Sequence, residues 1–281
     1  MGTARLKGAL LLFLSLSSGG CGNERATLVL AGTTSTYDSG LLEKLVQGFQ
    51  VEHPEAEVRT VVAGSGETLE LARRGDVDVI IVHAPEAETR FVEAGHATAR
   101  TPLMYNDFLI VGPVSDPASV RTAADPAEAF RRIAAEQALF VSRGDSSGTH
   151  FRELAIWRDA AVEPTGDWYI ESGQGQGTSL QIANERDAYT LTDRATFIVL
   201  SRLIELESLV GEHGSLLNLY SVIEPTAAVR RAEAATFANW LSSDGGMRLI
   251  SEFRFRSDTT PLFYPLVLGS RLPIPGAHEP H

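Results

Sequence analysis

The sequence of 281 residues contains a single cysteine, at position 21, and aromatic residues make up only 7% of it. One cysteine can form neither a disulfide framework nor a zinc cluster of thiolates. Basic residues are also scarce, because 24 Lys and Arg stand against 36 Asp and Glu, which gives a formal charge of −12. Nucleic-acid phosphates would repel such a chain, so we expect no nucleic-acid partner. The hydrophobic fraction of 43% is that of a globular protein with a sizeable core.

The first residues have the pattern of an export signal. Two basic residues precede an apolar stretch over residues 9–16, and small residues follow up to Cys21. This stretch is too short to cross a bilayer but suits a secretory signal peptide, which we place at residues 1–20. A cysteine after small residues resembles the bacterial lipoprotein signal, although Ser18 stands where leucine is usual. We therefore expect a periplasmic or cell-surface protein with Cys21 as the candidate lipidation site.

From residue 27 onward, short apolar runs alternate with amphipathic stretches. The predicted strands are 27–31, 58–63, 77–82, 108–112, 139–142, 168–171 and 219–224. The predicted helices lie around 38–52, 69–71, 91–92, 130–133, 154–157 and 237–250, the last interrupted near Asp244. Continuous apolar strands that alternate with helices predict an α/β fold with mainly parallel sheets.

The length and this pattern favour two α/β lobes with a ligand cleft between them. Residues 104–113 and 216–225 are extended and carry aromatic side chains, so we expect them to cross between the lobes. The predicted division gives a first lobe at 27–107 and 222–268, a second lobe at 108–221, and a disordered tail at 269–281.

Four predicted strands run into loops of Gly, Ser and Thr at which a helix begins. The loops span residues 32–40, 64–68, 142–149 and 172–179. A helix N-terminus presents unpaired N–H groups, and its dipole favours negative charge. Glycines allow the backbone to approach a ligand closely, and the hydroxyls of Ser and Thr can donate hydrogen bonds to it. Because loops at the carboxyl ends of strands line the crevice of open α/β sheets, we expect these four to converge on a small anion.

Arg143 is the only cation in these loops. Its guanidinium suits a charge-assisted contact with an oxyanion, whereas its spacing also allows a local ion pair with Asp145. We expect Asp38, Asp145 and Glu67 to cap helices or to orient donors, because a carboxylate that faced the anion would repel it.

Longer motifs resemble the tungstate-binding proteins of bacterial ABC importers. The motifs span residues 33–42, 78–84, 104–108, 142–150 and 188–194, and the resemblance covers nearly the whole chain after the signal. It implies a two-lobed periplasmic binding protein of type II-like fold. It also implies that Arg143 and Thr149 contact the anion, together with the N-terminal donors Thr34 and Ser35.

Loop position adds Ser65, Ser147, Gly177 and Thr178 to the candidate anion-binding residues. The resemblance implies a monomeric binding component, without enzymatic activity or cofactor, that delivers tungstate to a membrane permease driven by a separate ATPase. The alternatives are a protein for molybdate, sulfate, phosphate or a zwitterionic metabolite, or a sensory anion-binding module.

Two other hypotheses are weaker. Residues 144–148 come close to a serine-protease motif, but His150 lies four residues from Ser146 at a helix start, and the α/β pattern does not suit that fold. The seven histidines share no metal-ligand spacing, so we expect no metal site.

Overall fold

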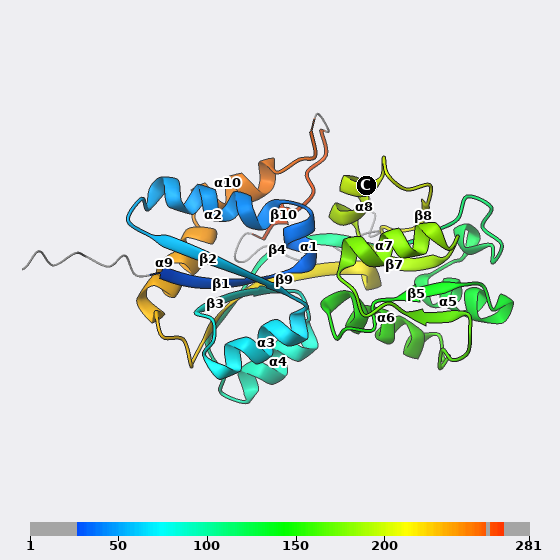
Figure 1. Cartoon of the computed structure of the whole chain (residues 1–281), viewed down its shortest axis with the longest axis horizontal. Coiled ribbons are helices and arrows are strands. Elements are labelled where there is room, and N and C mark those ends of the chain that lie inside the picture. Colours follow the sequence, from blue (N-terminus) through cyan, green and yellow to red (C-terminus); the bar gives the residue numbers. More distant parts are fainter. Residues whose placement is uncertain (1–26, 257–258, 267–281) are drawn as a thin grey trace, which may run out of the picture.

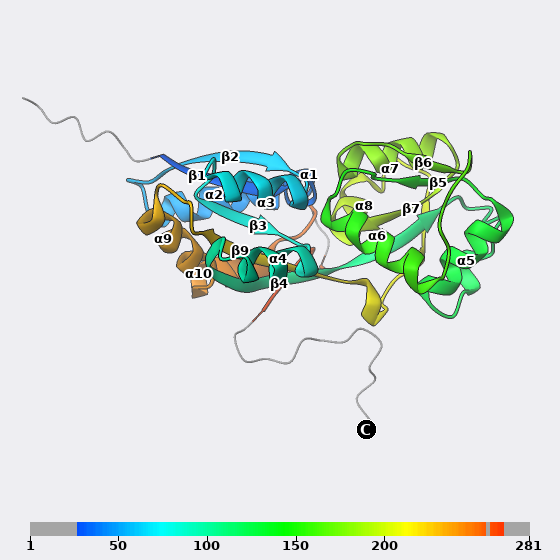
Figure 2. The same ribbon diagram turned by 90° about the horizontal axis from the view of Figure 1, so that it is seen from below.

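The computed structural model describes residues 27–256 and 259–266, so the predictions for the signal peptide, for Cys21 and for the tail after residue 268 lie outside it. Two lobes lie side by side, and the long strand β4 (Ala97–Gly112) runs through both of them (Figure 1, Figure 2). β4 pairs with β9 (Leu217–Pro225) as far as Asp107 and with β7 (Tyr189–Asp193) from Phe108 onward. We call the β9 side the first lobe and the β7 side the second lobe.

In the first lobe, five strands lie in the order β2-β1-β3-β9-β4, and β10 pairs with β4 at the edge. The strands not yet delimited are β1 (Thr27–Thr33), β2 (Glu57–Ala63), β3 (Val79–Val82) and β10 (Tyr264–Pro265). β2, β1 and β3 are parallel, whereas β9 runs antiparallel to β3 and to β4. Every residue of β3 is buried, as expected for a strand covered on both faces.

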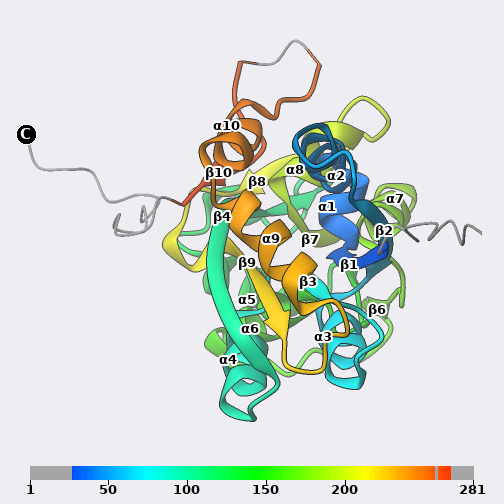
Figure 3. The ribbon, with the colours of Figure 1, turned by 90° about the vertical axis from the view of Figure 1, so that its left-hand side faces the viewer.

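Helices cover both faces of this sheet (Figure 3). They are α1 (Thr34–Asp38), α2 (Leu41–Glu52), α3 (Ser65–Arg74), α4 (Pro85–Glu93), α9 (Arg231–Leu241) and α10 (Asp244–Glu252). The larger apolar core joins α2, α9 and α10 to one face, and a smaller one joins α3 and α4 to the other. Gly48 allows α2 to approach α9 and α10 closely, because a Cβ there would lie 2.6 Å from Leu249 and 3.1 Å from Trp240.

The second lobe is built around the far half of β4. Its sheet has the order β4-β7-β5-β6, with β8 on β4 as well. The remaining elements are β5 (Phe140–Ser142), β6 (Tyr169–Glu171), β8 (Glu207–Val210), α5 (Pro126–Glu136), α6 (Gly148–Asp159), α7 (Gln176–Glu185), α8 (Arg194–Leu200) and the 3-10 turns at Val120–Thr122 and Gly214–Leu216. One core packs α5 and α6 against this sheet, and another packs α7 and α8.

The α/β architecture with two lobes agrees with the prediction, and all seven predicted strands are present. The sheets are mixed rather than uniformly parallel, because the two crossing strands β4 and β9 run against their neighbours. Sequence reasoning did not predict β7, β8, β10 or the first half of β4. It placed the break in the last helical region near Asp244, whereas the break is at Ser242 and Ser243, where the Ser243 hydroxyl caps α10.

The lobe boundaries at 107/108 and 221/222 stay predictions. The pairing shows that β4 changes its partner between Asp107 and Phe108 and that β9 pairs with the first lobe from Leu217. Among the described residues no helix is long and apolar enough to cross a membrane.

Candidate functional site

The four loops of Gly, Ser and Thr meet between the lobes. The backbone N–H of Gly66 donates to the carbonyl of Ser146 at 3.1 Å and so joins the second loop to the third. Gly66 has to be small here, because a Cβ would lie 2.7 Å from the same carbonyl oxygen. The first loop reaches the fourth where the N–H of Gly177 donates to the Asp38 carboxylate at 3.0 Å. The predicted convergence of these loops is therefore present in the fold.

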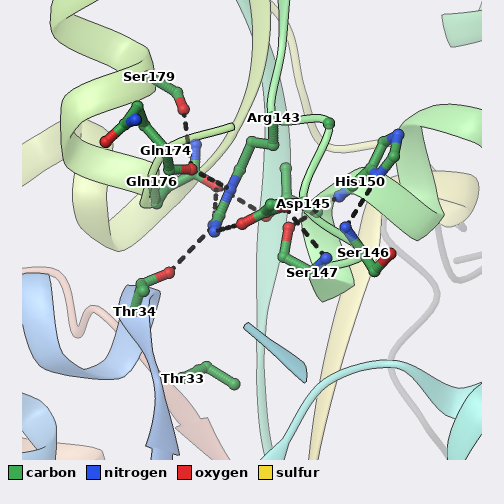
Figure 4. A network of polar contacts seen from close by, with 12 residues as sticks. Thr33, Thr34, Arg143, Asp145, Ser146, Ser147, His150, Gln174, Gln176 and Ser179 are labelled. Carbon is green, nitrogen blue, oxygen red and sulfur yellow. Dashed lines mark hydrogen bonds and ion pairs between the residues drawn. The ribbon is translucent and has the colours of Figure 1, made fainter. Parts of the chain in front are cut away.

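Arg143 lies at the centre of this meeting point and is only 1% exposed (Figure 4). Its Nη1 donates to the Thr34 hydroxyl across the lobes at 3.1 Å and to the Gln176 side-chain carbonyl at 3.3 Å. Its Nε donates to the carbonyl of Gln174 at 3.2 Å. These bonds hold the guanidinium rigidly between the first, third and fourth loops.

Asp145 neutralises and orients this cation. Its Oδ2 forms an ion pair with Nη2 of Arg143, and its Oδ1 accepts the backbone N–H of Ser147 at 3.1 Å. Both alternatives considered for Arg143 thus have a structural basis: the local ion pair is present, and the guanidinium also lies among the loops of both lobes. Asp145 orients donors, in agreement with the expectation from the sequence.

The predicted hydroxyl donors are buried in the same region. Ser35 and Ser65 are fully buried at the starts of α1 and α3, and the Ser65 hydroxyl accepts the backbone N–H of His83 at 3.4 Å. Ser147 caps α6 by accepting the N–H of His150. Thr149 is fully buried and donates to the side-chain carbonyl of Gln176 at 2.7 Å.

Two predicted anion-binding residues, Gly177 and Thr178, differ in their surroundings from the buried hydroxyl donors. The N–H of Gly177 is already bonded to Asp38, which therefore caps α7 from the opposite lobe. Thr178 is exposed and lies outside the network described above. We leave both out of the proposed set of ligand donors.

Sequence reasoning missed Gln176 and His83. Gln176 is fully buried as the first residue of α7, and its side-chain carbonyl accepts from both Arg143 and Thr149. The sequence feature that could have identified Gln176 as a site residue is its position directly after Gly175 in one of the four candidate loops. His83 follows β3 and lies 3.4 Å from the Ser35 hydroxyl through Nε2, a contact that no local pattern reveals.

Burial dominates the electrostatics of His83. Removal from water lowers the pKa of this imidazole to about 4, and the nearby positive charge of Arg143 acts in the same direction. The ring is therefore neutral at pH 7, with one nitrogen that donates and one that accepts. The contact of His150 is not the one that a general base for Ser146 would make, because its Nδ1 accepts the backbone N–H of Ser146 rather than the hydroxyl hydrogen.

A cavity of about 290 Å³ lies next to this network, between α4 of the first lobe and α6 of the second. It shares His83 and Gly148 with the network and carries Arg90, Arg152 and Arg158 on its walls. Arg143 and the predicted hydroxyl donors do not line it. The candidate site is thus the buried meeting point of the loops and not this larger hollow.

Comparison with known proteins places the chain in a class. Residues 22–245 match the PBP superfamily domain, and the chain belongs to this superfamily of two-lobed binding proteins. The tungstate-binding protein TupA of Peptoclostridium acidaminophilum is 36% identical over 247 residues, which are 86% of each chain. TupA of Campylobacter jejuni is 35% identical over 238 residues, 82% of this chain and 87% of that protein.

A solved structure supports the same family relationship. The tungstate ABC transporter structure from Geobacter sulfurreducens has a TM-score of 0.73 and 40% identity, and the match covers 81% of this chain and 98% of that one. Within the PBP superfamily, the protein is a member of the family of TupA-like tungstate-binding proteins.

Proposed function

We propose that this protein binds tungstate between its lobes and delivers it to the membrane permease of an ABC importer. The observation that carries the proposal is the meeting of four Gly, Ser and Thr loops from both lobes around the buried guanidinium of Arg143. The names of the relatives, which are tungstate-binding proteins or part of a tungstate transporter, support the same ligand.

Arg143 and Thr34 have donor capacity left for an anion. A guanidinium carries five N–H groups, and within the described residues four bonds engage those of Arg143. The Thr34 hydroxyl accepts one of these bonds, so its own hydrogen can point to a ligand. Ser35, Ser65 and Ser147 supply further hydroxyls within the same buried region. Thr149 lies there as well, but its hydroxyl hydrogen is donated to Gln176, so Thr149 would have to release that bond to donate to the anion.

The carboxylates bear on whether the bound anion carries a proton. Hydrogen phosphate keeps a proton at neutral pH and gains from an acceptor in its site. Here Asp38 accepts the N–H of Gly177, and Asp145 accepts from Arg143 and Ser147. Both oxygens of Asp145 are therefore engaged, whereas within the described part of the chain Asp38 accepts through Oδ2 alone. The preference for tungstate over phosphate accordingly rests on the names of the relatives. Molybdate has nearly the same size and charge as tungstate and fits the same donors.

The chain has the sequence features of an exported component of such an importer. We propose that residues 1–20 are removed as a signal peptide and that Cys21 carries a lipid anchor. The mass of the intact protein extracted from membranes tests the anchor, because acylation adds the mass of fatty chains and an unmodified mass contradicts it.

Calorimetric titration of the mature protein with tungstate, molybdate, sulfate and phosphate tests the ligand. We expect tight binding of tungstate or of both group-six oxyanions, with phosphate at least a hundredfold weaker. Absence of both heat and thermal shift with tungstate and molybdate would contradict the proposal.

A further inference from the structure

Two donors of the candidate site converge on one atom, the side-chain carbonyl oxygen Oε1 of Gln176. Nη1 of Arg143 donates to it at 3.3 Å (Figure 4), and the Thr149 hydroxyl donates to it at 2.7 Å. All three side chains are at most 1% exposed. The family resemblance implies that Arg143 and Thr149 both contact the anion. The oxygen of Gln176 therefore lies where an anion oxygen would meet a cation and a hydroxyl donor together.

The neighbours of the Gln176 amide determine its orientation. A guanidinium N–H can only donate, so the amide atom that faces Arg143 has to be the oxygen. The amide nitrogen then faces the backbone carbonyl oxygen of Leu191 on β7 and donates to it at 3.3 Å. An exchanged amide would place N–H against N–H at Arg143 and oxygen against oxygen at Leu191. The carbonyl oxygen is therefore the acceptor of both donors.

A count of hydrogens shows what this oxygen withholds from a ligand. Nη1 of Arg143 has two hydrogens, which are donated to Gln176 and to Thr34. Thr149 has a single hydroxyl hydrogen, which is donated to Gln176. An anion can accept from Thr149 only after this bond is broken. Withdrawal of the one Gln176 oxygen frees a hydrogen on each of the two residues.

This exchange can take place within the second lobe, to which all three residues belong. The first lobe covers the start of α7 in two places. Asp38 accepts the N–H of Gly177 at 3.0 Å, and Thr34 lies 3.5 Å from the position of a Cβ on Gly175. Separation of the lobes would remove this cover, and the glycines on both sides of Gln176 allow the backbone there to adjust.

Charge decides which acceptor is favoured. The amide oxygen and an oxyanion both form charge-assisted hydrogen bonds with Arg143, but only a dianion adds a full Coulomb attraction. A dianion can therefore replace the amide, and the amide can satisfy the buried guanidinium again when the dianion leaves. Every anion that uses these donors breaks the same bonds, so the competition lowers the affinity for each anion by the same factor.

We propose that the Gln176 carbonyl is a built-in competitor of the anion: the anion displaces it from Arg143 and Thr149 on binding, and its return accompanies release. This inference rests on the proposed function, since it concerns the donors that the oxyanion uses. Gln176 thereby limits the affinity of the site and shortens the residence time of the anion, which suits a protein that has to give up its ligand to a permease.

A crystal structure of the mature protein with tungstate tests the displacement directly. We expect Oε1 of Gln176 to lie beyond hydrogen-bond distance of Nη1 of Arg143 and of the Thr149 hydroxyl, with a tungstate oxygen in its place. Bound tungstate with both of these bonds retained would overturn the inference and leave the proposed function intact.

Variants test the sign of the effect on affinity. Gln176→Ala removes the competing oxygen, so titration calorimetry should show about tenfold tighter binding, by the same factor for tungstate and molybdate. A residue that only orients Arg143 and Thr149 would have the opposite effect, so equal or weaker affinity in this variant overturns the inference. Gln181→Ala is the matched control, because Gln181 is exposed on the same helix, and it should bind like the parent protein.

Gln176→Met keeps a long unbranched side chain without the amide and decides the question if Gln176→Ala does not fold. It should bind tungstate more tightly and release it more slowly in stopped-flow fluorescence, and parent or faster release would count against the competition. Failure of the parent protein to bind either group-six oxyanion overturns the proposed function, and this inference with it.

Discussion

The carboxylate of Asp38 in the first lobe accepts a hydrogen bond of 3.0 Å from the backbone N–H of Gly177 in the second. Gly177 is in the first turn of α7, so the carboxylate also lies at the positive end of a helix dipole. A charge-assisted hydrogen bond contributes about 2 kcal/mol, and this one stabilises the arrangement in which the lobes are in contact.

Asp38→Ala is therefore expected to favour separation of the lobes. Small-angle scattering without ligand should show a larger radius of gyration, and tungstate affinity should fall about tenfold because binding must then restore the contact. Asp38→Asn keeps an acceptor oxygen and should show a smaller effect. Identical scattering curves for Asp38→Ala and the parent protein would contradict this role.

Arg143→Ala should reduce tungstate affinity by at least about thirtyfold, since loss of one partner of a buried charge pair costs 2–5 kcal/mol. Arg143→Lys should also bind weakly, because an ammonium cannot reproduce the planar contacts to Thr34, Gln174 and Gln176. Titration calorimetry measures both. Arg132→Ala removes an arginine paired with Glu128 on α5 and should bind like the parent protein.

Gly148→Ala should prevent the lobes from closing fully. The added Cβ would lie 2.4 Å from the His83 carbonyl oxygen and 2.7 Å from its ring, and these residues belong to different lobes. We expect unchanged circular dichroism but weaker tungstate binding and a larger radius of gyration. Gly175→Ala at the same interface places its Cβ at 3.5 Å from Thr34, an ordinary contact, and should bind normally. Equal affinities of the two variants would argue against this steric limit.

Glu153 makes stability depend on pH. Burial raises its pKa from 4.5 to about 7, although its carboxylate accepts from Tyr169 and Trp157. The folded protein thus binds more protons than the unfolded chain between these values. Stability therefore falls as pH rises through this range, by at most about 3 kcal/mol.

Glu153→Gln should therefore raise the free energy of unfolding at pH 8 and change it little at pH 4.5. Denaturant unfolding at both pH values measures the difference. Asp159→Asn alters an exposed residue at the end of the same helix and should have a small effect that is equal at both pH values. An increase in the free energy of unfolding of Glu153→Gln that is the same at both pH values would refute this link between stability and the protonation of Glu153.

Much of the architecture could be predicted from local patterns. Apolar runs such as the one in β3 mark buried strands, and glycines followed by hydroxyl residues mark the starts of α3, α6 and α7. β7 was missed because Thr190 and Thr192 interrupt its apolar pattern, although both are buried. The first half of β4 was missed because it contains Pro102, where the ladder with β9 shifts register.

The contacts of the site were harder to predict than its loops. Arg143 could be identified as the one cation among them, but its bond to Thr34 depends on how the two lobes lie together. The same is true of Asp38, whose partner Gly177 is 139 residues away in the sequence. His83 and Asn218 are 135 residues apart and meet only because β9 lies beside β3.

The position of β9 has a consequence for biogenesis. This strand is inserted between β3 and β4, so the central ladder of the first lobe requires the chain up to Pro225. All strands and helices of the second lobe precede β9 in the sequence. β1, β2 and β3 pair with one another, but the ladder from β3 to β4 has to wait for this late segment, and pairings of such long sequence separation form slowly. A chain that completes its sheet late stays unfolded for longer during synthesis, which is compatible with the export proposed above.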